Sequence, residues 1–180
     1  MNAPVRRRRG WRVLGAAGVI GGAVTAWAFW FTHADLTHLR CEADSGAELF
    51  VDTKLHRLTS CEAGFPKATF RVRIGKQGAG KTREGDGRTP LGRYTLGPPG
   101  ASGAFGTFVP IHYPTESQKR QGMTGSAVGI HGPERHVRWL GAFVNTFDTT
   151  DGCVGLATDG EMHQLAEWLR RHRDAELTIR

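Results

Sequence analysis

The sequence predicts a mostly-β domain with one or two helices packed on it. Three observations support this fold class. The 180 residues include 25 glycines and 8 prolines, which is typical of a turn-rich, strand-rich domain. Several short segments alternate apolar and polar residues, as "ATFRVRIG" does, at the period of a strand. One segment near the C-terminus, "TDGEMHQLAEWLRRHRD", has the period of an amphipathic helix instead.

A basic head and an apolar run precede this domain. Residues 13–31 are 19 residues without a charge, close to the ~20 that span a bilayer. The arginines before the run favour a cytoplasmic head and an exported remainder. Because Ala26-Trp27-Ala28 also fits a signal-peptide cleavage site, we expect residues 1–32 to be either a hydrophobic helix anchored in the cytoplasmic membrane or a signal peptide. Residues 33–46 are polar and predict a linker to a single domain at 47–180.

The net charge of +7 comes mainly from the head. Five of the 24 basic residues lie there, and without them 19 basic residues face 17 acidic ones, a net charge of +2. No basic face with interleaved aromatic residues follows, so the sequence argues against a nucleic-acid partner.

The first half of the domain predicts four strands around one long loop. "ELFVDTKLHRLTSCEAG" alternates on both sides of residues 52–54, which indicates two short strands joined by a turn. "ATFRVRIG" predicts a third strand. "GKQGAGKTREGDGRTPLG" predicts a glycine-rich loop, with Arg88 and Thr89 shaping its turn, and "RYTLG" a strand after it.

The second half predicts three strands and two helices. "TFVPIHYP" predicts a strand that ends at Pro114, and "AVGIHG" one that ends at His131. Thr115 with Gln118, and Thr158 with Glu161, have the capping-box spacing that begins a helix. "AELTIR" predicts the closing strand.

Three cysteines follow the head. An exported domain meets an oxidising environment, where Cys41 and Cys61 either pair or stay as free thiols. A bond between them closes a loop of about 20 residues, which stabilises a fold by ~3 kcal/mol. Cys153 is then the odd cysteine, which is a liability or a reagent in such a protein.

Cys153 and His131 are the candidate reactive pair. A nucleophilic thiol needs a base within hydrogen-bond reach, and His131 ends a predicted strand 22 residues earlier. Gly152 lets the backbone aim amide groups at one point, as in an oxyanion hole, and Gly132 exposes a carbonyl that can orient the ring. Alternatively, Cys153 is a small core residue beside Val154 and Leu156. No second cysteine or histidine has metal-ligand spacing, so we expect neither metal nor cofactor.

The order of motifs resembles the YkuD-type L,D-transpeptidase family, in its T-x-G-C subgroup. "GIHG" and "TTDGC" carry the resemblance, together with "VDTKLHRL", "RVRIGKQGAGKTREGDGRTPLGRYTL" and "PIHYPTE". It extends from about Glu48 to the C-terminus. The resemblance implies a mainly β, barrel-like sandwich with one or two packed helices.

The resemblance also assigns roles to single residues. Cys153 matches the nucleophile, His131 the base that activates it, and Gly132 the carbonyl that steadies the base. Gly152 lies in the backbone around the oxyanion, and Thr150 matches the family's serine or threonine, which makes it a candidate substrate contact. The sequence departs from many members in two places. Gly155 stands where they have arginine or asparagine, and Asp151 where they have histidine or arginine, which bears on substrate contacts and thiol acidity.

Three further residues are candidates for substrate binding. Tyr113 either lines the cleft or packs within a strand. Arg138 and Trp139 lie between His131 and Cys153, where they either form a lid wall that grips a substrate carboxylate or belong to a solvated loop.

The implied activity is peptidoglycan L,D-transpeptidation in the cell envelope, outside the cytoplasm. Cys153 attacks the third-residue carbonyl of a tetrapeptide stem, releases D-alanine, and passes the acyl group to an amine of another stem. Two alternatives stay open: a hydrolase of the same fold, and a non-catalytic wall-binding module.

Overall fold

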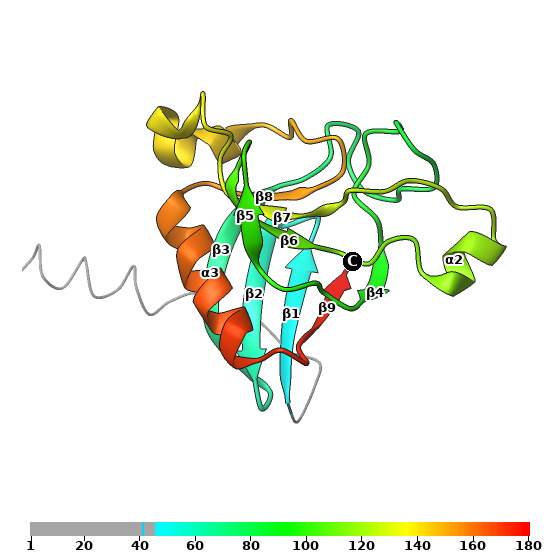
Figure 1. Cartoon of the computed structure of the whole chain (residues 1–180), viewed down its shortest axis with the longest axis horizontal. Helices are drawn as coiled ribbons and strands as arrows, with labels where there is room; N and C mark the ends of the chain where they lie inside the picture. Colours follow the sequence, from blue (N-terminus) through cyan, green and yellow to red (C-terminus); the bar gives the residue numbers. More distant parts are fainter. Residues whose placement is uncertain (1–40, 42–45) are drawn as a thin grey trace, which may run out of the picture. The chain divides into compact units, whose positions relative to one another are not determined.

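Nine strands form one sheet in the part of the chain that the structure describes, which is Cys41 and residues 46–180 of a computed structural model. The strand order is β4-β9-β1-β2-β3-β8-β7-β6-β5. The bounds are β1 Ala47–Asp52, β2 Arg57–Glu62, β3 Phe65–Arg73, β4 Gly92–Tyr94, β5 Gly100–Ser102, β6 Gly106–Pro110, β7 Gly129–His131, β8 Val154–Leu156 and β9 Glu176–Ile179. This sheet with its helices confirms the predicted fold class (Figure 1).

The expectations for the N-terminus concern residues that the structure does not describe. Residues 1–32, expected to be an anchor or signal peptide, lie outside the described residues, as does most of the linker at 33–46. No helix within Cys41 and residues 46–180 is long and apolar enough to span a membrane.

The central strands follow the predicted alternation. β1, β2 and β3 form an antiparallel meander, and β9 adds to β1 in parallel. Every second residue of β1 and β2 contributes to the core, because strand side chains alternate between the two faces. The fully buried ones include Leu49, Val51 and Leu58. The predicted strands at both ends of the domain are thus confirmed.

Both capping boxes form as predicted. Thr158 Oγ1 accepts from Glu161 N at 3.1 Å, and Glu161 Oε2 accepts from Thr158 N at 3.0 Å, at the start of α3 (Asp159–Arg171). α3 buries its apolar side and contacts β6 and β8, as seen beside the sheet in Figure 1. α2 (Glu116–Arg120) begins with the same arrangement at Thr115. Such caps contribute ~1 kcal/mol each.

One local prediction differs from the structure, and one segment for which no element was predicted forms a helix. The strand expected to end at Pro114 is β6, which ends at Pro110, because proline lacks the N–H that a ladder needs. The segment between His131 and Cys153 forms η1 (Arg138–Thr146), a kinked 3₁₀ helix with a positive φ at Gly141.

A disulfide joins Cys41 to Cys61 in β2. Of the two possibilities that the sequence left open, the structure has the bonded one. Cys153 is the free cysteine among the described residues.

Candidate active site

Two short parallel strands bring His131 and Cys153 together. Ile130 pairs with Val154 and His131 with Gly155, and Cys153 directly precedes β8. Since side chains two positions apart on a strand share a face, Cys153 projects from the same face as Gly155, and therefore from the same face as His131. The two residues are diagonal neighbours across this pair of strands.

His131 is held in one orientation. Its side chain is buried, and its Nδ1 lies 2.6 Å from the carbonyl oxygen of Gly132. Because a carbonyl only accepts, Nδ1 carries the proton and Nε2 is left as an acceptor. The Phe105 ring stacks on the imidazole with centroids 3.8 Å apart. Burial lowers the pKa of His131, although the Gly132 carbonyl opposes that shift, so the ring is a neutral base at pH 7.

The turn that carries Cys153 is shaped by Thr150. Its Oγ1 donates to the carbonyl oxygen of Cys153 at 2.7 Å and accepts from Gly152 N at 3.2 Å. Thr150 also bonds through its backbone to Ile74 and Lys76 at the end of β3. The residue expected to contact substrate is buried and uses its hydroxyl within the turn.

Gly152 is required by a close approach of the backbone. Its φ is +131°, and a Cβ there would lie 2.6 Å from the carbonyl oxygen of Arg88. Any other residue therefore meets both strain and a clash with main-chain atoms. Arg88 belongs to the glycine-rich loop at 75–92, so this loop packs directly on the Cys153 turn.

The Cys153 thiol rests against main-chain groups. Its Sγ lies 3.7 Å from the carbonyl oxygen of Ala127. Burial raises the pKa of the thiol; a backbone hydrogen bond from Gly129 and the charge of Lys81 act in the opposite direction, whereas Asp151 raises it further. Within the described residues no hydrogen bond joins the thiol to the His131 ring. The resting pair is thus a neutral thiol beside a neutral imidazole, and direct proton transfer requires the thiol to turn from Ala127 toward the ring.

Alkylation of Cys153 by iodoacetamide is expected to depend on pH in a defined direction. Only the thiolate reacts, and a raised pKa means a smaller thiolate fraction at pH 7 than in free cysteine. The rate should rise with pH and reach half its maximum above the ordinary cysteine pKa. Stopped-flow alkylation from pH 5 to 10 measures this profile. A plateau that is already reached below pH 7 would indicate a preformed thiolate–imidazolium pair and contradict this description.

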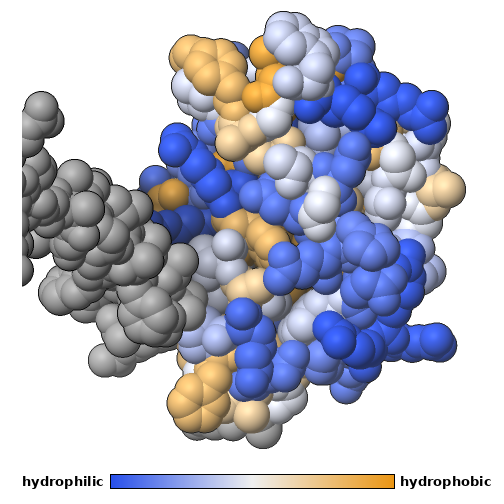
Figure 2. Space-filling model, turned by 90° about the vertical axis from the view of Figure 1, so that its left-hand side faces the viewer, coloured by the Kyte–Doolittle hydropathy of each residue, from blue (hydrophilic) through white to orange (hydrophobic). Residues whose placement is uncertain are grey.

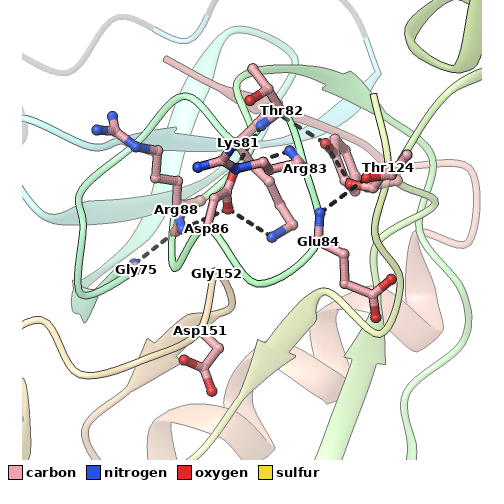
Figure 3. Close-up of polar contacts among 12 residues, drawn as sticks. Gly75, Lys81, Thr82, Arg83, Glu84, Asp86, Arg88, Thr124, Asp151 and Gly152 are labelled. Atoms are coloured by element: carbon pink, nitrogen blue, oxygen red, sulfur yellow. Dashed lines mark hydrogen bonds and ion pairs between the residues drawn. The ribbon is translucent and has the colours of Figure 1, made fainter. Parts of the chain in front are cut away.

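The glycine-rich loop is organised around Asp86 (Figure 3). The carboxylate accepts from the backbone N–H groups of Thr82, Arg83 and Arg88 at 2.8–3.1 Å, and from Lys81 Nζ at 3.0 Å. Burial alone would raise the pKa of Asp86, but these hydrogen bonds outweigh it and hold the pKa far below its usual value. The loop over the Cys153 turn is therefore pinned by one buried ion pair, with Gly152 drawn beneath it in Figure 3.

A buried arginine explains the departure at Gly155. A Cβ at Gly155 would lie 2.8 Å from Nε of Arg73, which is fully buried. The guanidinium of Arg73 donates to Glu134 at 3.0 Å and to Asn145 at 3.1 Å. Glycine is needed there because the Arg73 side chain from β3 occupies the space that a side chain at position 155 would fill. The sequence shows the glycine but not the side chain that covers it.

The other predicted contacts lie around this centre without touching it. Tyr113 is buried and donates through its hydroxyl to the carbonyl of Lys81 at 3.3 Å; it lines a pocket of about 600 Å³ with Gly125. Arg138 forms an ion pair with Asp159 at 3.3 Å. Trp139 is 78% exposed. Their predicted role in substrate binding stays a prediction.

An apolar surface lies beside the pair. Hydrophobic side chains gather over η1 at the top of the face in Figure 2, and the exposed ones are Trp139, Phe143 and Phe147. Phe143 and Phe147 line a pocket of about 410 Å³, together with Glu134 and Thr149. Thr149 directly precedes Thr150, so one wall of this pocket continues in sequence into the Cys153 turn.

One family model and several solved structures match the chain. The YkuD family model, described as the L,D-transpeptidase catalytic domain, matches residues 46–176. No curated protein matches the chain. Among solved structures, the chain is similar to Pgp2, the helical cell shape determining protein of Campylobacter jejuni, with a TM-score of 0.61 and 25% sequence identity over 84% of this chain and 54% of Pgp2.

A second solved structure shares the fold alone. Bd1075 of Bdellovibrio bacteriovorus has a TM-score of 0.55 and 19% identity over 77% of this chain and 49% of its own. The chain thus matches about half the length of each of these structures.

Proposed function

Because the chain belongs to the YkuD family of L,D-transpeptidase catalytic domains, we propose that it is a peptidoglycan L,D-transpeptidase with Cys153 as its nucleophile. The acyl donor is a tetrapeptide stem, and the bond broken joins its third residue to the terminal D-alanine. The acceptor is an amine of a second stem. Residues 47–180 form the catalytic domain in this proposal, and residues 1–32 the membrane anchor or signal peptide.

The proposed reaction has two acyl transfers. Cys153 gives its proton to Nε2 of His131 as Sγ bonds to the carbonyl carbon, the C–N bond to D-alanine breaks, and the leaving amine takes the proton from His131. The acceptor amine then attacks the thioester, His131 takes its proton, and the C–S bond breaks to restore the thiol. Backbone N–H groups at the turn other than that of Gly152, which already donates to Thr150 Oγ1, stabilise the oxyanion in both steps. No metal or nucleotide is needed.

One observation carries the proposal. The Gly132 carbonyl fixes the protonated nitrogen of His131, while the parallel pairing of β7 with β8 presents Cys153 on the same face. A buried structural cysteine does not need an oriented, neutral base on the neighbouring strand. Thiol, base and orienting carbonyl are what acyl transfer from a peptide requires.

The similarity to Pgp2 supports action on the cell wall. That protein is described as a determinant of helical cell shape, and cell shape is maintained by the wall. We therefore place this domain in the cell envelope, outside the cytoplasm, where stem peptides are found.

Product analysis tests the proposal. Purified residues 41–180, kept oxidised at Cys41–Cys61, are incubated with disaccharide-tetrapeptides, and the muropeptides are identified by mass spectrometry. A cross-linked dimer with release of D-alanine is the expected product. Tripeptides without dimers would mean that water resolves the thioester, as in a hydrolase. Binding to wall material without any product would favour the wall-binding module and end the proposal.

A further inference from the structure

Lys81 is a buried cation directly behind the Cys153 turn. Its side chain is 3% exposed, and Nζ pairs with Asp86 at 3.0 Å. Gly125, which has a positive φ, makes room for it, because a Cβ there would lie 3.0 Å from Lys81 Cε. A Cβ at Gly152 would lie 3.7 Å from Nζ, which is ordinary contact distance. The Lys81 ammonium therefore lies within contact distance of the Cβ position of Gly152, the residue before Cys153.

We propose that Lys81 supplies a fixed positive charge that stabilises negative charge at Cys153, first on the thiolate and then on the oxyanion of the bound acyl group. Lys81 acts through space and through the turn, without touching substrate, and so is a positioning residue. This inference deepens the proposed function and rests on it for the oxyanion.

One backbone N–H of the Cys153 turn is not available to an oxyanion, and a nearby positive charge compensates for it. The N–H of Gly152 donates to Thr150 Oγ1 at 3.2 Å, so it is not free to donate to an oxyanion. A charge in a partly desolvated site acts more strongly than in water. The Lys81 ammonium stabilises the negative charge that develops on the oxyanion, to which the Gly152 N–H does not donate.

Asp86 does not cancel this charge. Its two oxygens accept from three backbone N–H groups and the ammonium. Lys81 lowers the pKa of the Cys153 thiol, whereas Asp86 is not among the groups that raise it. A lysine ammonium has three N–H donors, and the bond to Asp86 uses one of them. Figure 3 shows Lys81 and Asp86 above Gly152, with the Asp151 side chain directed away from the pair.

The other charged groups near Cys153 oppose its ionisation or are paired with each other. Asp151 and Glu134 both raise the pKa of the thiol, whereas Lys81 lowers it. Asp151 is exposed and pairs with Lys76 at 2.7 Å, and Glu134 pairs with Arg73. The groups that face the site from the packed elements are Arg73, Lys76, Lys81, Asp86, His131, Glu134 and Asp151. Lys81 is the buried cation among them that favours the thiolate.

Thiol alkylation of Lys81→Met tests the inference without any wall substrate. The iodoacetamide rate at pH 7 is expected to fall about five- to tenfold, because an opposite charge that favoured the thiolate is lost, and the whole profile should move to higher pH. Lys67→Met is the matched control: it removes an exposed lysine paired with Glu62 at the other end of β3, and its profile should overlay the parent's. An unchanged profile in Lys81→Met would overturn the inference.

The double variant Lys81→Met/Asp86→Asn separates charge from loop integrity. It removes both charges and so leaves no unpaired carboxylate. Because an amide accepts on one oxygen only, whereas both Asp86 oxygens accept in the parent, urea denaturation is measured on both variants and alkylation is compared where each is folded. In the double variant, alkylation should remain slower than in the parent, and its profile should remain shifted to higher pH. Recovery of the parent profile would show that Lys81 only neutralises Asp86 and would overturn the inference. On muropeptides, kcat should fall with KM nearly unchanged. A shifted alkylation profile in a chain that makes no muropeptide product would retain the charge effect while rejecting the proposed function.

Discussion

Replacing Cys153 with alanine is expected to abolish turnover and leave the fold intact. The variant loses the atom that forms the thioester, so kcat should fall by at least about 10⁴-fold. The turn does not depend on the sulfur, because Thr150 Oγ1 bonds to the backbone of Cys153 and Gly152. The free energy of unfolding should change by less than ~1 kcal/mol. Muropeptide turnover and urea denaturation of the same preparation measure both quantities.

The opposite pattern would identify a core residue. Destabilisation of about 2 kcal/mol or more, together with retained turnover, would mean that Cys153 packs against Val154 and Leu156 without reacting. Cys153→Ser serves as the second variant, because it keeps the size and polarity of the side chain but is a far weaker nucleophile at neutral pH. It should be as inactive as the alanine variant.

Gly152→Ala is expected to be the most damaging small substitution near the site. The new Cβ would lie 2.6 Å from the Arg88 carbonyl at a φ of +131°. Backbone strain of ~1–3 kcal/mol adds to a clash that only a shift of the turn relieves. We expect a loss of about 3 kcal/mol in stability. A displacement of Cys153 by about 1 Å lowers kcat by about 100-fold.

Gly78→Ala is the matched control. It lies in the glycine-rich loop that packs on the Cys153 turn, with a φ of +79°, but nothing lies within 4 Å of its Cβ position. It should cost ~1 kcal/mol from strain alone and leave kcat nearly unchanged. Equal losses of stability and of kcat in the two variants would mean that the contact between Arg88 and Gly152 does not position the nucleophile. Urea denaturation and muropeptide kinetics are measured on both.

The elements with local signals were predictable. The capping residues Thr115 and Thr158 and the alternation in β1 to β3 depend only on neighbours in sequence. The parallel pairing of β9 with β1 was not predictable, because it joins the two ends of the domain. Gly100–Ser102 forms β5 although it lacks an apolar residue larger than alanine, so no periodicity marked it. The last turn of η1 contains a buried asparagine, Asn145, which bonds Arg73 and the Arg71 carbonyl, and this tertiary contact left no pattern in the sequence.

The residues of the candidate site also divide into those that the sequence marked and those that it did not. The order of "GIHG" and "TTDGC" marked His131 and Cys153, and the structure brings them onto adjacent strands. Lys81 and Arg73 were missed because their importance comes from being buried beside glycines that are distant in sequence. Gly155 was the available signal: a glycine in a strand marks a close approach by another group, and here that group is Arg73.

The central claim is that Cys153 carries the acyl group. Rapid acid quenching of the chain with disaccharide-tetrapeptide, followed by intact-protein and peptide mass spectrometry, detects this intermediate directly. The account predicts an adduct of the donor stem minus D-alanine on the peptide that contains Cys153, absent from Cys153→Ala and lost on treatment with hydroxylamine. Product formation by Cys153→Ala, or an adduct on any other residue, would contradict it.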